Sequence, residues 1–225
     1  MPDADITKAA ANIISSAFGS AGQRCMACSA VVVVGDREDF VKELKKQADD
    51  LVVGNGMDED VLLTAVIRQS QKEKLLTYID KGLEEGAKLV RDGRDGMDEQ
   101  QEGYFLGPTI FDYVKPEMTI AKEEMFGPIL SLLRAESLDE GLEFIRQSRF
   151  GNRATIYTKD ARAVRQFREE ADAGMLGINV GVPATMAFFP FSGWKDSFYG
   201  DLHVNGKDGV NFYTRRKMIT SRFDY

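Results

Sequence analysis

Residues 18–28 read Phe18-Gly-Ser-Ala-Gly-Gln-Arg-Cys25-Met-Ala-Cys28 and join a predicted helix, residues 6–18, to a predicted strand, residues 27–34. Cys25 follows small residues and stands directly after Arg24. Small residues let a substrate reach the sulfur and let backbone N–H groups point toward a developing oxyanion. A neighbouring cation lowers the pKa of a thiol and favours the nucleophilic thiolate. The alternative is a buried core cysteine, which is common for free thiols.

Outward from this stretch, hydrophobic patterns predict strands that alternate with helices. The expected strands are residues 27–34 (buried on both faces), 87–90, 105–114, 129–133, 154–157 and 174–180. After the helix at residues 6–18, further helices are expected to begin at Asp36, Asp60, Ser137 and Asp160, which are suited to capping. At Ser137 the spacing to Glu140 is typical of a capping box. The alternation predicts an α/β domain with a mainly parallel sheet.

Composition restricts the class of protein. The chain has 225 residues, enough for one domain or one and a half, and its net charge of -7 argues against a nucleic-acid surface. It contains two cysteines and one histidine, His203, which excludes a disulfide framework and makes a Ser-His or Cys-His pair improbable. No apolar run approaches the roughly 20 residues of a membrane span, and the start does not resemble a signal peptide. We therefore expect no membrane association and a cytoplasmic location, or the mitochondrial matrix in a eukaryote.

Two features resemble metal sites. Cys25 and Cys28 have the Cys-x-x-Cys spacing of a redox pair or half a zinc site. No third cysteine is available to complete a zinc site, and the motif precedes its strand, whereas a thioredoxin-like motif follows one. The polar loop at residues 91–103 lacks the spacing of a calcium-binding EF-hand. We expect Cys28 to be a packing residue and the chain to bind no metal.

Four segments in order carry a resemblance to a known family. Residues 18–27 (FGSAGQRCMA), 103–111 (GYFLGPTIF), 122–128 (KEEMFGP) and 190–197 (PFSGWKDS) resemble signatures of the aldehyde dehydrogenase superfamily. The finer pattern, with Arg24 before the cysteine and residues 211–214 reading NFYT, is most similar to the methylmalonate- and malonate-semialdehyde dehydrogenases, the CoA-acylating branch.

The resemblance implies an architecture. Residues 1–205 would form an aldehyde dehydrogenase catalytic domain, and residues 206–225 a C-terminal oligomerisation strand. The β-prone part of that tail, residues 210–220, would pair with another subunit, as edge strands do. A homo-oligomer, either a dimer or a tetramer, is the expected assembly.

The resemblance also implies a reaction. Cys25 would attack the aldehyde to give a thiohemiacetal, NAD would accept the hydride, and the remaining thioester would pass its acyl group to CoA. Arg24 would bind the carboxylate of a small semialdehyde substrate, which suits a planar guanidinium. The alternatives for Arg24 are that it only tunes the Cys25 thiol or that it points into solvent.

Four more site residues follow from the resemblance. Glu124 would accept hydrogen bonds from the nicotinamide-side ribose, and Phe126 would pack near that end of the cofactor. A solvated charged pair formed by Glu123 and Glu124 is the alternative. Asn179 and Phe191 would line the substrate pocket, although a structural role is open for both.

The chain departs from the family pattern in lacking a Gly-x-Gly-x-x-Gly turn. We therefore expect the NAD-binding domain to lie upstream of residue 1 and the chain alone to have little activity. Two other functions remain open. One is a hydrolytic aldehyde dehydrogenase that releases the free acid, and the other is a non-catalytic dimerisation module.

Overall fold

The structure is a computed structural model that describes residues 1–95 and 102–224. Its main sheet has the strand order β1-β4-β3-β2, and these strands are Ala30–Val34, Ile129–Ala135, Thr109–Asp112 and Lys88–Arg91. β1 and β3 each pair with β4 in parallel, whereas the edge strand β2 is antiparallel to β3. The predicted α/β fold with a mainly parallel sheet is therefore confirmed.

Two smaller sheets lie beside the main one. β6 (Arg153–Ile156) pairs in parallel with β7 (Met175–Ile178), and β5 (Phe150–Gly151) pairs antiparallel with β8 (Trp194–Lys195). β6 and β7 confirm the strands predicted at residues 154–157 and 174–180. The start of β6 lies close to the cysteine loop, which makes this pair part of the site described below.

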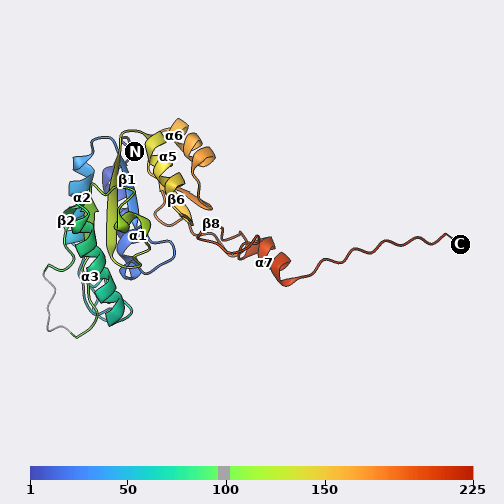
Figure 1. Cartoon of the computed structure of the whole chain (residues 1–225), viewed down its shortest axis with the longest axis horizontal. Helices are drawn as coiled ribbons and strands as arrows, with labels where there is room; N and C mark the ends of the chain where they lie inside the picture. Colours follow the sequence, from blue (N-terminus) through green and yellow to red (C-terminus); the bar gives the residue numbers. More distant parts are fainter. Residues whose placement is uncertain (96–101, 225) are drawn as a thin grey trace.

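Helices surround the strands, as Figure 1 shows. They are α1 (Ile6–Phe18), the 3-10 turn η1 (Gly19–Gly22), α2 (Glu38–Asp49), α3 (Gln69–Glu84), α4 (Thr119–Lys122), α5 (Leu138–Gln147), α6 (Ala161–Glu170) and α7 (Gly206–Tyr213). Two predicted caps are confirmed. Ser137 Oγ accepts a hydrogen bond from the Glu140 N–H at 3.2 Å, and Asp160 Oδ1 accepts one from the Arg162 N–H at 2.8 Å.

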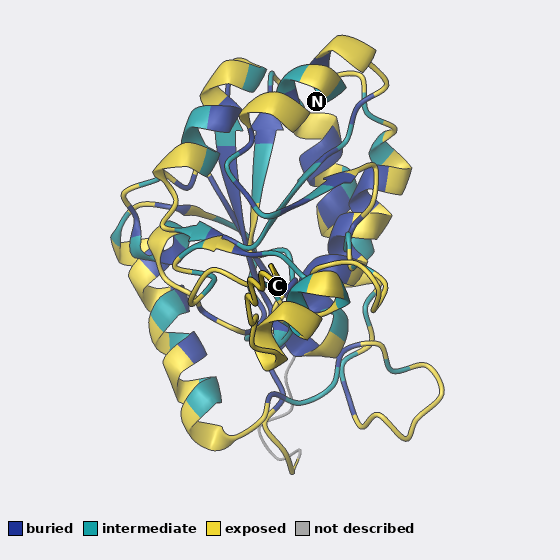
Figure 2. Cartoon of the chain, turned by 90° about the vertical axis from the view of Figure 1, so that its right-hand side faces the viewer, coloured by how far each residue is buried: buried dark blue, intermediate teal, exposed yellow. Residues whose placement is uncertain are grey.

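The core has two parts. The larger cluster joins the main sheet to α1, α2 and α3, and the smaller one packs Leu142, Ile156 and Phe167 between α5, β6 and α6. Figure 2 shows the buried residues on the strands and the inner helix faces, with exposed residues outside. Within residues 1–95 and 102–224, no helix combines the length and the apolar character that a membrane crossing requires.

Two predicted helix starts are wrong. The helix expected at Asp60 begins instead at Gln69, because the apolar residues before it form an extended segment. Leu63 donates its N–H to the Val52 carbonyl at 3.1 Å, and Val66 donates to the Tyr104 carbonyl at 2.9 Å. Asp36 does not cap α2, whose N-cap position is Arg37.

Two predicted strands are shorter than expected. β3 covers only Thr109–Asp112 of the predicted residues 105–114, since Gly107 donates its N–H to the Gly93 carbonyl in a loop. β1 begins at Ala30, which is exposed, and becomes buried only at Val33 and Val34. Its first half faces the cavity described below, so the expectation of burial on both faces is wrong there. Residues 96–101 of the predicted loop at 91–103 lie outside the described residues.

The prediction of a C-terminal strand at residues 210–220 is partly wrong. Its first residues, 210–213, belong to α7, which begins after the N-cap Asn205 and buries no residue. Residues 214–224 have no regular secondary structure and run away from the body of the molecule (Figure 1). A strand requires a partner strand for its backbone groups, and the sheets of the described chain include no strand from residues 214–222. Its pairing with another subunit stays a prediction, as does the domain boundary at residue 205.

Candidate active site

The loop that carries Cys25 leaves α1 through a strained turn. Ser20 and Ala21 have φ angles of 54° and 53°, and Gly22 follows at 69°. Residues other than glycine rarely adopt positive φ, and each costs on the order of 1–3 kcal/mol. Such strain collects at active sites and ligand clamps. The backbone at η1 therefore marks this loop as a candidate functional segment.

The loop packs directly on the segment that carries Glu124 and Phe126. Gly22 lies so close to Gly127 that no side chain would fit between them. Gln71, from α3, holds the same segment from the other side, because its Nε2 donates to the carbonyl oxygens of Met125 and Phe126, both at 2.9 Å. Two motifs that lie about a hundred residues apart in the sequence thus form one structural unit.

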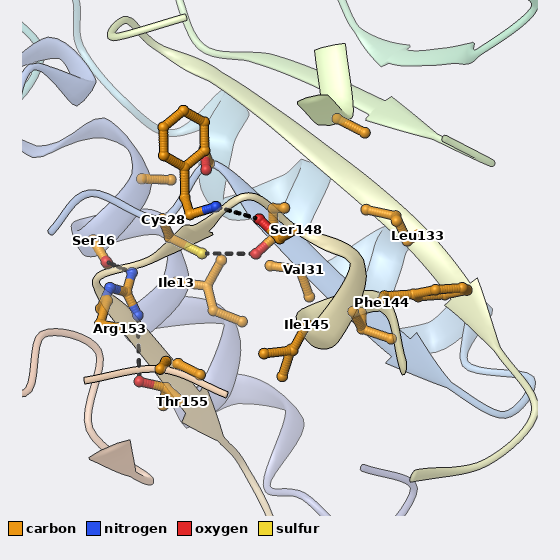
Figure 3. A pocket seen from close by; sticks show the side chains of 18 of the residues that line it. Ile13, Ser16, Cys28, Val31, Leu133, Phe144, Ile145, Ser148, Arg153 and Thr155 are labelled. Carbon is orange, nitrogen blue, oxygen red and sulfur yellow. Dashed lines mark hydrogen bonds between the residues drawn. The ribbon is translucent and has the colours of Figure 1, made fainter. Parts of the chain in front are cut away.

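A cavity of about 1060 Å³ adjoins this unit. Its interior is largely apolar, with Ile13, Val31, Phe144 and Ile145 among the side chains that line it (Figure 3). Five of the six predicted site residues also line it, namely Arg24, Cys25, Glu124, Phe126 and Phe191. An apolar cavity with a few polar groups at its wall is the usual form of a small-molecule site.

The two cysteines differ in their surroundings. Cys25 is exposed at the cavity wall, and its carbonyl oxygen accepts a hydrogen bond from Asn152 Nδ2 at 2.7 Å. Cys28 is partly buried, and its thiol donates to the Ala30 carbonyl oxygen at 3.4 Å. Burial raises the pKa of the Cys28 thiol, although the nearby Arg153 opposes this shift. Cys28 therefore stays a neutral packing residue at neutral pH, and the described residues contain no group of three or more potential metal ligands.

Arg24 is anchored on the end of α1. Its Nη2 donates to the carbonyl oxygens of Ser15 at 2.8 Å and Ser16 at 3.3 Å, where a cation also offsets the helix dipole. A Cβ on Gly19 would lie 2.7 Å from this Nη2, so the glycine makes room for the guanidinium. Arg24 Nε is buried without a hydrogen-bond partner. The alternative in which Arg24 points into solvent is wrong.

Glu124 and Glu123 are both exposed, but among the described residues only Glu123 has an ion-pair partner. Glu123 lies 3.8 Å from Arg149 in an ion pair, whereas within the described part of the chain no hydrogen bond or ion pair involves the Glu124 carboxylate. Phe126 is 40% exposed and has a φ of 54°, so its ring stands at the edge of the cavity in a strained backbone position. Both groups are thus free to contact a ligand.

Asn179 is not brought to this cavity. Its Nδ2 donates to the Thr158 carbonyl at 2.9 Å, and its Oδ1 accepts from the Thr158 N–H at 3.0 Å. These bonds join the ends of β6 and β7, so the structure gives this side chain a role within the fold. Phe191 lines the cavity, and its N–H donates to the Val204 carbonyl at 2.7 Å.

Sequence reasoning missed Gln71, Asn152 and Arg153. Each is a polar residue whose side chain holds the backbone of one of the two motifs. No local pattern reveals such a residue, because its partner lies far away in the chain. Only the pairing of residues in the fold identifies them.

The chain is similar to known proteins over most or all of its length. The model of the family described as "Aldehyde dehydrogenase family" matches residues 1–219. All 225 residues of the chain align with malonate-semialdehyde dehydrogenase 1 of Geobacillus kaustophilus at 77% identity, and the aligned part is 46% of that protein. It therefore spans about half the length of the curated relatives it matches.

Two solved structures are similar over the whole chain. One, from Sinorhizobium meliloti, is named as a methylmalonate-semialdehyde dehydrogenase complexed with NAD; it has a TM-score of 0.96 and 41% identity, and the match covers 46% of that chain. The other, a methylmalonate-semialdehyde dehydrogenase from Oceanimonas doudoroffii, has a TM-score of 0.95 and 39% identity, with 47% of that chain covered.

Proposed function

Because the chain belongs to the aldehyde dehydrogenase family, we propose that it supplies the nucleophile and one edge of the cofactor site of an NAD-dependent semialdehyde dehydrogenase. The substrate is malonate semialdehyde or methylmalonate semialdehyde, and CoA accepts the acyl group. One observation carries the proposal, namely the exposed Cys25 thiol at the wall of a cavity that Arg24 and Glu124 also line. The names of the similar proteins support the choice of substrate.

Cys25 performs the covalent step. Its thiolate attacks the aldehyde carbon, a C–S bond forms, and the carbonyl π electrons move to the oxygen, where the Cys25 backbone N–H is a suitable donor. A bound NAD would supply the acceptor for the hydride that this carbon releases. The C=O bond re-forms as a thioester on Cys25. A CoA thiolate then attacks this carbonyl, and the Cys25 thiolate leaves.

Arg24 recognises the substrate carboxylate in this scheme. Its Nη2 is committed to the end of α1 and its Nε is buried, but within the described residues no hydrogen bond involves Nη1, which can contact the carboxylate. A semialdehyde carries its carboxylate close to the reacting carbonyl, so a guanidinium beside the nucleophile is well placed to bind it. The anchored Nη2 reduces the freedom that Arg24 loses on binding.

Glu124 and Phe126 fit the nicotinamide end of NAD. An exposed carboxylate without a partner is a good acceptor for the two ribose hydroxyls, and an exposed ring beside it packs against an apolar edge. The chain contains no glycine-rich phosphate loop, so its own residues would contact only this end of the cofactor. Phe191 supplies an apolar wall for the substrate. Asn179 has the weakest support among the predicted site residues, because Thr158 occupies both its side-chain groups.

Assembly into a homo-oligomer is part of the proposal. The tail exposes large apolar side chains, including the neighbours Met218 (91% exposed) and Ile219 (74%). Adjacent exposed apolar residues indicate a surface that another subunit covers. A chain that only dimerised would need no reactive thiol, so the reactivity of Cys25 separates the two functions.

The first experiment measures the rate at which iodoacetamide alkylates each cysteine of the 225-residue chain, followed by peptide mass spectrometry. We expect Cys25 to react quickly and to be protected by malonate semialdehyde, with Cys28 as the internal control that reacts slowly. Slow and unprotected labelling of Cys25 would contradict the proposal. On a chain extended upstream, an acyl-CoA product supports the acylating reaction, whereas free acid in the presence of CoA supports the hydrolytic one.

A further inference from the structure

The start of β6 holds the cysteine loop at two adjacent points. Asn152 Nδ2 donates to the Cys25 carbonyl oxygen at 2.7 Å, and Arg153 Nε donates to the Met26 carbonyl oxygen at 3.0 Å. The donors are consecutive residues, and so are the acceptors. Because the contacts cross 127 positions of sequence, they fix the loop to a separate part of the fold.

Arg153 extends the attachment to α1. Its Nη2 donates to Ser16 Oγ at 2.9 Å, and its Nη1 donates to Thr155 Oγ1 at 3.3 Å (Figure 3). Ser16 in turn contacts the far side of the loop, since its carbonyl oxygen accepts the Cys28 N–H at 3.2 Å. One guanidinium thus connects α1 and β6 to the Met26 peptide group, and the Ser16 carbonyl connects α1 to Cys28.

These contacts have no ion-pair component. Within residues 1–95 and 102–224, no carboxylate lies within 4.0 Å of the Arg153 guanidinium, and its three oxygen partners are neutral, while the Cys28 thiol also lies near it. A half-buried cation without a counter-ion loses solvation, so its hydrogen bonds must offset that cost. The position of Arg153 is therefore explained by the backbone that it holds.

We propose that Asn152 and Arg153 are positioning residues for Cys25, which fix the peptide groups after the nucleophile and so hold its thiol at the cavity wall. The inference rests on the proposed function, because it takes Cys25 as the nucleophile. The Cys25 side chain is exposed and has little packing of its own, so its position depends on its backbone. Misplacement of a reacting atom by about 1 Å is enough to slow a reaction about a hundredfold.

Asn152 permits a test that separates hydrogen bonding from packing. Asn152→Asp keeps the shape but turns an acceptor oxygen toward the Cys25 carbonyl, whereas Asn152→Ala removes the group. If the hydrogen bond that Asn152 donates holds the loop, Asn152→Asp loosens the loop more than Asn152→Ala does. If only the shape of the side chain matters, Asn152→Asp behaves like the wild type. The control is Asn12→Asp, because Asn12 Nδ2 donates to the Lys8 carbonyl at 2.9 Å within α1, away from the loop.

The first measurement is amide hydrogen exchange of the peptide that contains residues 23–28. In it, Ala27 donates its N–H to the Arg24 carbonyl at 3.0 Å and Cys28 donates to Ser16, so loosening the loop exposes both amides. Loss of one ordinary hydrogen bond predicts roughly fivefold faster exchange in Asn152→Ala, and tenfold or more in Asn152→Asp. Amide exchange in β4, a strand of the main sheet, should not change. Arg153→Ala should resemble Asn152→Ala, and Arg153→Lys, which keeps a donor, should recover part of the protection.

The second measurement is the rate at which iodoacetamide alkylates Cys25 in the same variants. This rate should fall most in the variants whose loop amides exchange fastest. Faster exchange confined to the loop together with slower alkylation supports the inference. Three results would overturn the inference. They are unchanged amide exchange in the loop, equal effects of Asn152→Asp and Asn12→Asp on that exchange, and faster loop exchange with an unchanged alkylation rate at Cys25. Failure of malonate semialdehyde to protect wild-type Cys25 would count against the proposed function instead, because the exchange measurement does not require catalysis.

Discussion

A Cβ atom on Gly22 would lie 2.2 Å from the carbonyl oxygen of Gly127. The backbone of the cysteine loop is therefore in direct contact with the backbone of the segment that carries Glu124 and Phe126. This contact fixes the distance between the nucleophile and the proposed cofactor edge without using any side chain. It explains the glycine at position 22, whereas a Cβ atom on Gly127 would instead lie 2.3 Å from the Leu75 side chain.

Gly22→Ala should destabilise the protein more than an ordinary glycine substitution. Gly22 has a φ of 69°, and Gly86 provides a matched control because its φ is 93° but nothing lies within 4 Å of its would-be Cβ. Backbone strain alone predicts a loss of about 1–2 kcal/mol for Gly86→Ala. The additional clash with Gly127 should bring the loss for Gly22→Ala above about 3 kcal/mol. Urea unfolding measures the loss of stability in each variant, and equal losses for Gly22→Ala and Gly86→Ala would contradict the close contact with Gly127.

The ion pair between Asp112 and Arg134 connects β3 to β4. Arg134 Nε and Nη2 donate to the two Asp112 oxygens at 2.8 and 2.6 Å, and the Asp112 side chain is only 3% exposed. This bond to Asp112 raises the pKa of Arg134, so the guanidinium stays charged. Arg134→Met leaves a buried carboxylate unpaired, which costs about 3–5 kcal/mol.

The control for that substitution is Arg146→Met. Arg146 pairs with Glu143 at 2.9 Å, but both side chains are more than 40% exposed. Such a solvent-exposed pair contributes little to stability, because water screens the two charges. Urea unfolding at neutral pH should therefore separate the two substitutions, and equally small losses of stability at both sites would show that the Asp112 pair is solvated.

The relation between sequence and fold depends on the range of the interactions. The α1 boundaries and the Ser137 cap were predictable, because helix periodicity and capping involve residues a few positions apart. The segment before Gln69 was not, since its apolar residues suit a helix equally well and are drawn into extended pairing by Val52 and Tyr104.

The candidate site shows the same difference between short-range patterns, which the sequence reveals, and long-range contacts, which it does not. Cys25 and Glu124 were predicted from motifs, and the structure places both at one cavity. Asn152 and Arg153 were not predicted, because a single hydrogen bond across 127 positions leaves no periodic signal. Asn179 is predicted in the pocket from the family resemblance, whereas its amide donates to and accepts from the Thr158 backbone.

Arg24→Ala should weaken the recognition of acidic substrates selectively. In the wild-type chain, malonate semialdehyde should protect Cys25 from alkylation at lower concentration than propanal does. Loss of a charge-assisted hydrogen bond predicts that the protecting concentration of malonate semialdehyde rises on the order of tenfold, with little change for propanal. Arg24→Lys keeps the charge but not the guanidinium that is anchored on Ser15 and Ser16, so its effect should lie between those of the wild type and Arg24→Ala. Equal losses for both aldehydes would mean that Arg24 only supports the end of α1.

Cys28 makes stability depend on pH in the alkaline range. Burial raises the pKa of its thiol in the folded protein, whereas in the unfolded chain the thiol ionises near its ordinary value, at about pH 8.5. Above that pH the unfolded state binds fewer protons than the folded state, so ionisation favours unfolding and the free energy of unfolding falls as the pH rises.

Cys28→Ala removes this contribution. The variant should be less stable than the wild type at pH 7, since a buried side chain is truncated, but the difference should shrink between pH 8.5 and pH 10. Urea unfolding of both proteins at several pH values measures the difference, and Tyr157, whose pKa burial raises to about 12, titrates above this range. A difference that stays constant with pH would show that the Cys28 thiol ionises as easily in the folded protein as in the unfolded chain.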